Sequence, residues 1–299
     1  MIVQVGLVQK SGASPPARNM EIIEGYLRQA ARLGLQLVVL PELHNGPYFC
    51  QSQDPAYFDW AESIPGPTTL QLAAWAKQYQ LVIVGSLFER RLPGLYHNTA
   101  VVLDRDGRLA GTYRKMHIPD DPGFYEKYYF TPGDQGFQCI DTSLGRLGVM
   151  VCWDQWFPEA ARIMALSGAQ ILIYPTAIGW DPRDDDTEQQ RQLQAWITIQ
   201  RAHAIANGLP VLVCNRVGLE PHPQDTNPGT QFWGHSFMSD AFGKVMAIGD
   251  SEQSGLIHAT VDLAECEKIR QIWPFLRDRR IDAYQPLLQR AVIPPDKTH

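Results

Sequence analysis

Short runs of apolar, mostly β-branched residues alternate along this 299-residue chain with longer amphipathic segments. The runs are typical of buried strands and the longer segments of helices, so the alternation indicates βαβ units. Such strands belong to a sheet covered by helices on both faces, or by helices on one face and a second sheet on the other. We expect strands at residues 2–8, 35–40, 81–87, 147–151, 171–174 and 211–214. We expect helices at residues 18–33, 68–78, 158–167 and 187–206.

The order of these elements occurs twice along the chain. In the first half, residues 98–115 (NTAVVLDRDGRLAGTYRK) follow the three strands and are typical of a hairpin with its turn at Asp106-Gly107. In the second half, residues 236–249 (SFMSDAFGKVMAIG) hold the equivalent position. No linker separates the halves, and residues 221–228 are typical of a surface loop. We therefore predict one domain over residues 1–290 with an internal repeat, followed by a flexible tail at residues 291–299.

The charge balance excludes several classes of partner. Lys and Arg number 26 and Asp and Glu number 32, a formal charge of −6, which argues against nucleic acid and against an anionic membrane surface. No apolar run approaches the ~20 residues of a spanning helix, and the first ten residues do not resemble a signal peptide. We therefore expect a cytoplasmic protein.

Cysteine and histidine usage bears on cofactors. The five cysteines have no CxxC spacing and are too sparse for a disulfide framework, and the eight histidines show no metal-ligand spacing. Motifs for phosphate, dinucleotide or zinc binding and for a serine nucleophile are missing from the sequence. We expect chemistry without a metal or another cofactor. Because the number of cysteines is odd, at least one thiol must be free, and the question is which cysteine lies where a thiolate would be useful.

Three residues with useful chemistry follow predicted strands, where reactive groups of α/β sheets gather. Glu42 follows LVVLP, Lys115 ends a hairpin strand, and Cys152 ends LGVMV. Burial next to an apolar strand would raise the pKa of Glu42 and suit it to proton transfer. Lys115, pointing inward, could hold a developing negative oxygen. Cys152 precedes a bend and the helix-starting Pro158, so we expect the helix terminus to favour the thiolate and the sulfur to be exposed.

Each of these residues also has a structural interpretation that the sequence leaves open. Cys152 could be a small buried side chain, Glu42 a solvated carboxylate, and Lys115 a charge that protects a sheet edge.

The segments around these residues resemble the nitrilase superfamily of carbon-nitrogen hydrolases. The matching segments are LVVLPEL around Glu42, YRKMHIP around Lys115, YEKYYFTPGD, and LGVMVCWDQWFPE around Cys152, in the family's order and at similar spacing. The resemblance implies an α/β fold, a four-layer αββα sandwich with an internal pseudo-two-fold repeat. It also implies a homodimer or a larger homo-oligomer.

The same resemblance implies roles for particular residues. Glu42 would accept the thiol proton of Cys152, which would attack an amide or ureido carbon, and Lys115 with the main-chain N–H of Trp153 would hold the oxyanion. Glu126, in YEKYYF, matches a second glutamate that orients the lysine. The alternative for Glu126 is a surface carboxylate paired with Lys127.

The small-molecule substrate is suggested by MHIPDDPGFYEKYYFTPGD and PTAIGWDP, which look most like the branch that cleaves N-carbamoylputrescine. A cationic tail needs carboxylates and aromatic faces, whereas a carboxylate tail, as in an N-carbamoyl amino acid, needs an arginine fork such as Arg114 or Arg216 could supply. An ω-amidase, a nitrilase and a catalytically silent member remain alternatives. The candidates for contact with the tail are Asp120, Asp121, Asp181, Tyr125, Trp153 and Trp180.

Overall fold

The computed structural model describes residues 1–12, 15–222 and 228–292; most of the loop expected at 221–228 and of the tail expected at 291–299 lies outside these ranges. One six-stranded sheet has the order β15-β1-β2-β3-β4-β5. Strands β1, β2 and β3 are parallel, and β15, β4 and β5 run antiparallel to their neighbours. The bounds are β1 (Ile2–Gln9), β2 (Leu37–Val39), β3 (Val82–Leu92), β4 (Leu95–Leu103), β5 (Leu109–Arg114) and β15 (Gly255–Asp262).

The second six-stranded sheet has the order β6-β7-β8-β10-β13-β14. Its three central strands β7, β8 and β10 are parallel, and the hairpin of β13 and β14 follows them in an antiparallel sense. The two sheets thus repeat one plan, with β15 and β6 as the added outer strands, as the predicted repeat requires. The bounds are β6 (Ile140–Thr142), β7 (Gly145–Val149), β8 (Ile171–Pro175), β10 (Val211–Cys214), β13 (Phe237–Ser239) and β14 (Val245–Ile248).

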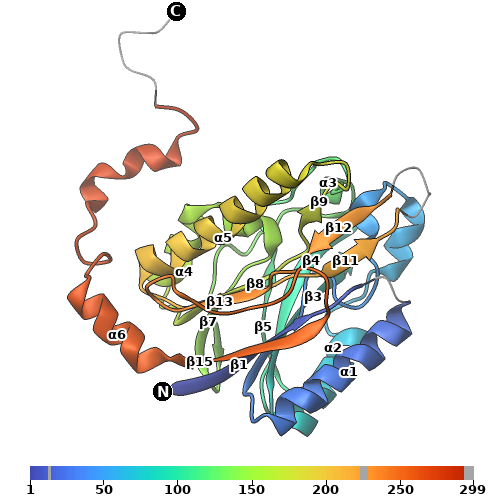
Figure 1. Ribbon diagram of the computed structural model, residues 1–299, viewed down its shortest axis with the longest axis horizontal. Helices are drawn as coiled ribbons and strands as arrows, with labels where there is room; N and C mark the ends of the chain where they lie inside the picture. The colour runs from blue at the N-terminus through green and yellow to red at the C-terminus, as the bar shows by residue number, and fades with distance from the viewer. Residues whose placement is uncertain (13–14, 223–227, 293–299) are drawn as a thin grey trace, which may run out of the picture.

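Alternating strand residues define the layers. Val5 and Leu7 of β1 lie in one buried core with Val149 of β7 and Ile173 of β8, so these residues pack between the two sheets. Val8, the next residue of β1, lies instead in a core with residues of the helices α1 (Pro16–Arg32) and α2 (Pro67–Tyr79). The helices α4 (Pro158–Leu166) and α5 (Asp186–Asn207) cover the other sheet, on the opposite side of the strands (Figure 1). The architecture is the expected αββα sandwich.

Helix starts follow local chemistry. Helices α1, α2 and α4 each begin with proline, whose fixed φ and missing N–H suit the first helical position. Helix α5 is capped by Asp185, whose carboxylate accepts a hydrogen bond from the main-chain N–H of Glu188 at 2.9 Å. Because α4 begins at Pro158, the connection after β7 spans only residues 150–157, and Cys152 lies in this short turn.

A third, three-stranded sheet was not predicted from the sequence. It has the order β11-β12-β9, with β9 (Gly179–Trp180), β11 (Val217–Glu220) and β12 (Thr230–Trp233). Its strands are only two to four residues long and belong to the connections that follow β8 and β10, so they carry little sequence periodicity. This sheet lies beside the short helix α3 (Glu126–Tyr129) in Figure 1.

The carboxyl-terminal part of the chain runs away from the sandwich (Figure 1). After α6 (Leu263–Ile272), two 3₁₀ turns, η4 (Ile281–Ala283) and η5 (Gln285–Leu288), form an arm with large exposed apolar side chains. Leu288, for example, is 88% exposed. Within the described ranges, no helix combines the length and the apolar character needed to cross a membrane.

Candidate active site

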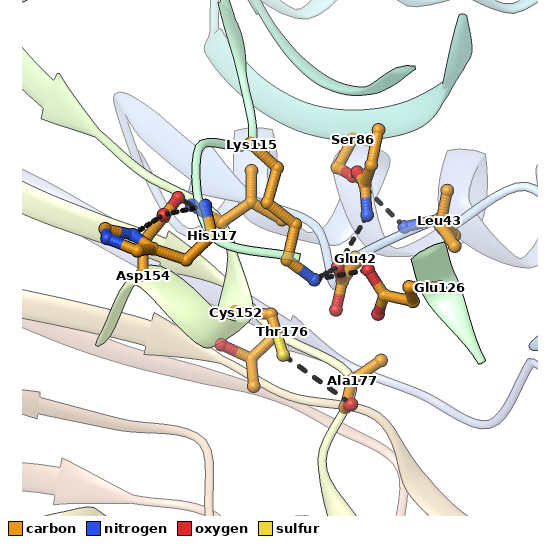
Figure 2. Close-up of polar contacts among 12 residues, drawn as sticks. Glu42, Leu43, Ser86, Lys115, His117, Glu126, Cys152, Asp154, Thr176 and Ala177 are labelled. Carbon is orange, nitrogen blue, oxygen red and sulfur yellow. Dashed lines mark hydrogen bonds and ion pairs between the residues drawn. The ribbon is translucent and has the colours of Figure 1, made fainter. Parts of the chain in front are cut away.

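Four of the sequence candidates meet at the carboxyl ends of strands from both sheets (Figure 2). Glu42 follows β2 and Lys115 follows β5 in the first sheet, and Cys152 follows β7 in the second. Glu126 begins α3, in the loop that leaves the first half. The three charged residues are fully buried, and Cys152 is 3% exposed. This burial contradicts the alternatives that the sequence left open. Glu42 is not a solvated carboxylate, Lys115 does not protect an exposed sheet edge, and Glu126 is not a surface carboxylate paired with Lys127.

Lys115 lies between the two carboxylates. Its Nζ donates to Oε1 of Glu42 at 2.7 Å and to Oε2 of Glu126 at 2.6 Å. Burial alone would lower the pKa of Lys115, but the negative charges of Glu126 and Glu42 outweigh it, and the pKa lies well above its ordinary value. Burial raises the pKa of Glu126 from 4.5 to about 7, although Lys115 and the hydroxyl of Tyr48 oppose the rise. The lysine is therefore a fixed cation.

Asn98 holds the same oxygen of Glu42. Its side-chain amide donates to Oε1 of Glu42 at 2.6 Å and accepts from the hydroxyl of Ser86 at 2.8 Å. Oε2 of Glu42 has no hydrogen-bond partner among the described residues. One carboxylate oxygen is thus anchored and the other is left to take a proton. Sequence reasoning missed Asn98, although the sequence holds a signal for it. Asn98 lies on the same face of β4 as Ala100 and Val102, which pack in the core between the sheets, so it is a polar residue on a buried face.

Cys152 opens the 3₁₀ turn η3 (Cys152–Trp156) with a left-handed φ of 42°. A non-glycine residue at such a φ is strained and is common in turns that aim a nucleophile. Its Sγ lies 3.7 Å from the main-chain oxygen of Ala177. Burial, with Glu42 nearby, raises the pKa of the thiol well above its ordinary value. The expectation of an exposed sulfur favoured as thiolate is therefore wrong, because the bend is covered by other segments and is not the first turn of α4.

Asp154, two residues after Cys152, was also missed. This buried carboxylate accepts hydrogen bonds from the main-chain N–H groups of Val151 at 3.1 Å and His117 at 3.0 Å, and from the hydroxyl of Tyr113 at 2.8 Å. His117 Nδ1 lies 2.6 Å from it as well (Figure 2). Asp154 thus ties the turn that carries Cys152 to the strand that carries Lys115.

Cys152 and Glu126 line a pocket of about 530 Å³. Glu42 and Lys115 are not among its lining residues and lie behind Glu126, which accepts a hydrogen bond from Lys115. Of the expected contacts for the substrate tail, Trp153, Asp121 and Asp181 line this pocket. Tyr125 and Trp180 line an adjoining hollow of about 590 Å³ that shares Asp181. Asp120 is exposed and is not among the lining residues of either space.

The two arginines considered for a carboxylate tail are engaged elsewhere. Arg114 pairs with Glu89 at 2.7 Å, and Arg216 is buried and pairs with Glu220 at 2.8 Å. A third arginine, Arg191 of α5, lines the pocket and was not considered from the sequence.

No set of three or more His, Cys, Asp or Glu side chains in the described part of the chain is arranged to hold a metal ion. The charged residues of the site are instead hydrogen-bonded to one another, which suits acid-base and nucleophilic chemistry.

Comparisons with known proteins define the class. The family model "Carbon-nitrogen hydrolase" matches residues 4–271. A citrullinase of Francisella tularensis is 40% identical over 96% of this chain and 99% of its own length. An N-carbamoylputrescine amidase of Solanum lycopersicum is 39% identical over 96% of this chain and 95% of its own. The crystal structure of a carbon-nitrogen hydrolase from Helicobacter pylori G27 matches with a TM-score of 0.95 at 50% identity, covering 98% of this chain and all of that one.

The chain belongs to the carbon-nitrogen hydrolase family, the nitrilase superfamily. It is a hydrolase that acts on carbon-nitrogen bonds, and the family and fold predicted from its motifs are confirmed.

Proposed function

We propose that this protein is a cysteine-dependent amidohydrolase that cleaves the ureido group of N-carbamoylputrescine to putrescine, carbon dioxide and ammonia. The observation that carries the proposal is the convergence of Glu42, Lys115, Glu126 and Cys152, of which Glu126 and Cys152 line one pocket. A buried base, a fixed cation and a thiol together match the requirements of acyl transfer.

In the first half-reaction, Glu42 takes the thiol proton and the sulfur of Cys152 bonds to the ureido carbon. Since the pKa of the thiol is raised, the attack needs this base. Lys115 and the main-chain N–H of Trp153 stabilise the negative oxygen of the tetrahedral intermediate. When the intermediate collapses, the carbon-nitrogen bond breaks, and the leaving ammonia or amine takes the proton from Glu42. A carbamoyl thioester on Cys152 remains.

In the second half-reaction, Glu42 deprotonates a water molecule, whose oxygen bonds to the thioester carbon. The carbon-sulfur bond breaks and Cys152 regains a proton through Glu42. The product is a carbamic acid, which loses carbon dioxide and leaves the remaining amine or ammonia. Glu126 touches Lys115 throughout and keeps the cation in place.

The tail of the substrate is assigned from charge. Asp121 lines the pocket and forms no ion pair with any described residue, whereas Asp181 is paired with Arg183. A carboxylate without a counter-ion, near the aromatic faces of Trp153, Trp156 and Phe124, suits an alkylammonium group.

The experiment that tests this assignment compares ammonia release from N-carbamoylputrescine with that from N-carbamoyl-β-alanine, an ω-amide and a simple nitrile. Equal or faster turnover of any of the other three would overturn the assignment, as would no turnover of all four.

A second candidate substrate is citrulline, whose tail carries both an ammonium and a carboxylate. Arg191 favours it, because this arginine lines the pocket on the side of α5 and is 76% exposed, although its Nε donates to Glu188 at 2.8 Å. The 40% identity to a citrullinase is a further reason to test it.

Two substitutions separate these substrates. Asp121→Asn should raise KM for N-carbamoylputrescine about tenfold and leave N-butylurea, which lacks the ammonium, unchanged. Arg191→Gln should weaken only citrulline. Two results together would assign citrulline as the substrate instead. The parent enzyme would turn over citrulline faster than N-carbamoylputrescine, and Arg191→Gln would weaken the binding of citrulline.

We also propose that the chain acts as a homodimer or a larger homo-oligomer in the cytoplasm. The exposed apolar side chains of the arm, such as Ile281, Leu287 and Leu288, support a second copy as their contact, because such a patch is unfavourable in water. Truncation after Ile272 should lower the number of copies per particle, which is the mass measured by light scattering divided by the mass of the truncated chain. An unchanged number of copies would contradict a role for the arm.

A further inference from the structure

A second group of buried charges lies behind the site. Lys10 follows β1, Arg216 follows β10, and Glu220 ends β11. Each is at most 1% exposed, and Nη1 of Arg216 lies 2.8 Å from Oε1 of Glu220. We call these three residues the Arg216 cluster. None of them is among the residues that line the pocket, and their hydrogen bonds to the site go to the main chain after Glu42 and to Tyr48.

The Arg216 cluster holds the main chain that carries Glu42. Arg216 donates through Nε to the carbonyl oxygen of Glu42 at 3.1 Å, through Nη1 to that of Gly46 at 3.1 Å, and through Nη2 to that of Leu43. Lys10 donates to the carbonyl oxygen of His44 at 3.3 Å. Leu43 has a left-handed φ of 49°, which is strained for a leucine and needs the surroundings to maintain it. Arg216 and Lys10 thus hold the turn directly after the proposed base by hydrogen bonds to its carbonyl oxygens, although burial and the charge of Arg216 lower the pKa of Lys10 to about 7.

The same cluster reaches the second glutamate through Tyr48. Oε2 of Glu220 accepts from the main-chain N–H of Tyr48 at 2.7 Å, and the hydroxyl of Tyr48 donates to Oε1 of Glu126 at 2.8 Å. The guanidinium of Arg216 lies 5.7 Å from the centre of the Tyr48 ring. Glu220 is therefore linked to Glu42 through Arg216 and to Glu126 through Tyr48.

We propose that Arg216 and Glu220 are positioning residues, which set where the carboxylates of Glu42 and Glu126 stand on either side of Lys115 and thereby set the rate of proton transfer. The proposal rests on the proposed function of Glu42 as base. A guanidinium suits this task because its planar fork can donate to several carbonyl oxygens and a carboxylate at once, whereas an ammonium cannot reach them all.

The test is Arg216→Lys, which keeps the charge and removes the fork. A displacement of about 1 Å at Glu42 is expected to lower kcat 10- to 100-fold with KM changed less than about twofold. The matched control is Arg270→Lys, since Arg270 is half-buried in α6 and likewise donates to two carbonyl oxygens, those of Asn207 and Ala169, away from the site. This control should keep kcat within twofold.

A double-mutant cycle separates positioning from general destabilisation. The readout is the rate at which iodoacetamide alkylates Cys152, with Cys139 of the same chain as internal reference, because alkylation needs the base and no turnover. Arg216→Lys should slow alkylation in the parent enzyme and add nothing in the Glu42→Gln background. An unchanged kcat, or the same slowing in both backgrounds, overturns the proposal.

Two outcomes are distinguished in advance. If Arg216→Lys does not fold, as shown by its melting curve, Glu220→Gln is measured with the same readouts and the same criteria. If Glu42→Gln itself keeps parental activity and alkylation, the proposed function of Glu42 fails first; if only Arg216→Lys is without effect, the positioning proposal fails alone.

Discussion

In the first half of the sandwich, the ends of β1, β2 and β5 lead to Lys10, Glu42 and Lys115, all buried and ionisable. In the second half, the corresponding strands β7, β8 and β14 lead to Cys152, to Ala177, which offers its main-chain oxygen, and to Asp250, which is exposed. The strand order is the same in both halves, so the backbone repeats while the chemistry does not. In the proposed reaction, the first half supplies the groups for proton transfer and charge stabilisation, and the second half supplies the nucleophile.

The largest expected effect tests the nucleophile of the second half. Cys152→Ser should lower turnover more than about 10³-fold while the protein stays folded, because a hydroxyl is a far weaker nucleophile at the same position. The measurement is ammonia release with a melting curve beside it. Cys139→Ser, a half-buried cysteine outside the site, is the control and should keep activity. More than a tenth of parental activity in Cys152→Ser would place the nucleophile elsewhere.

The next effect tests the base of the first half. In Glu42→Gln the side-chain oxygen can still accept the hydrogen bond from Asn98, but the amide cannot take a proton. We therefore expect kcat to fall about 10²- to 10⁴-fold. Substrate binding, measured by equilibrium methods, should persist. Glu159→Gln, an exposed glutamate in the first turn of α4, serves as control. Full activity of Glu42→Gln would remove the distinction between the two halves.

A smaller effect tests the hydrogen bonds by which Asp154 of the second half holds Tyr113 and His117 of the first half. In Asp154 the two oxygens accept separately from the N–H groups of Val151 and His117, so Asp154→Asn places its amide donor against one of these N–H groups and loses that buried hydrogen bond. The free energy of unfolding should fall by about 1–3 kcal/mol in urea, and kcat should fall about tenfold. Asp106→Asn, in the exposed turn of the first hairpin, should change neither quantity. An unaffected kcat with normal stability would show that the halves align without Asp154.

The smallest effect concerns pH. Because burial raises the pKa of Glu126 to about 7, activity should rise as pH increases through 7 and this carboxylate becomes able to hold Lys115. The effect on stability has the opposite sign: between pH 4.5 and 7 the folded state binds the extra proton, so this group's contribution falls as pH increases.

Tyr48→Phe tests that assignment. It removes a hydrogen bond that lowers the pKa of Glu126, so the acid limb of the kcat profile should move up by about one pH unit. Tyr128→Phe, an exposed tyrosine of α3, should leave it in place. A stationary limb in Tyr48→Phe would mean that another group controls it.

Sequence reasoning was sufficient for the central strands of the two six-stranded sheets and for part of the site. Glu42, Lys115 and Cys152 were found because strand ends are visible as the ends of apolar runs, and Glu126 was found only through the family motif. The environment of Cys152 was not predictable, since its neighbour Ala177 lies in the connection between β8 and β9, which is distant in sequence and joins the short sheet only in the folded chain. Asp154 was missed for a similar reason: its partners at Tyr113 and His117 belong to the other half.

The two groups of buried charges also limit how such an enzyme can change. Around Lys115 there are two carboxylates and one ammonium, and the Arg216 cluster pairs a guanidinium with a carboxylate beside Lys10, whose pKa burial lowers to about 7. A substitution that removes the charge of one member of a buried pair leaves its partner without a counter-charge in the interior, which lowers stability. Variants with new substrates are therefore expected to arise at exposed pocket residues such as Asp121 and Arg191, where one residue can be exchanged at a time.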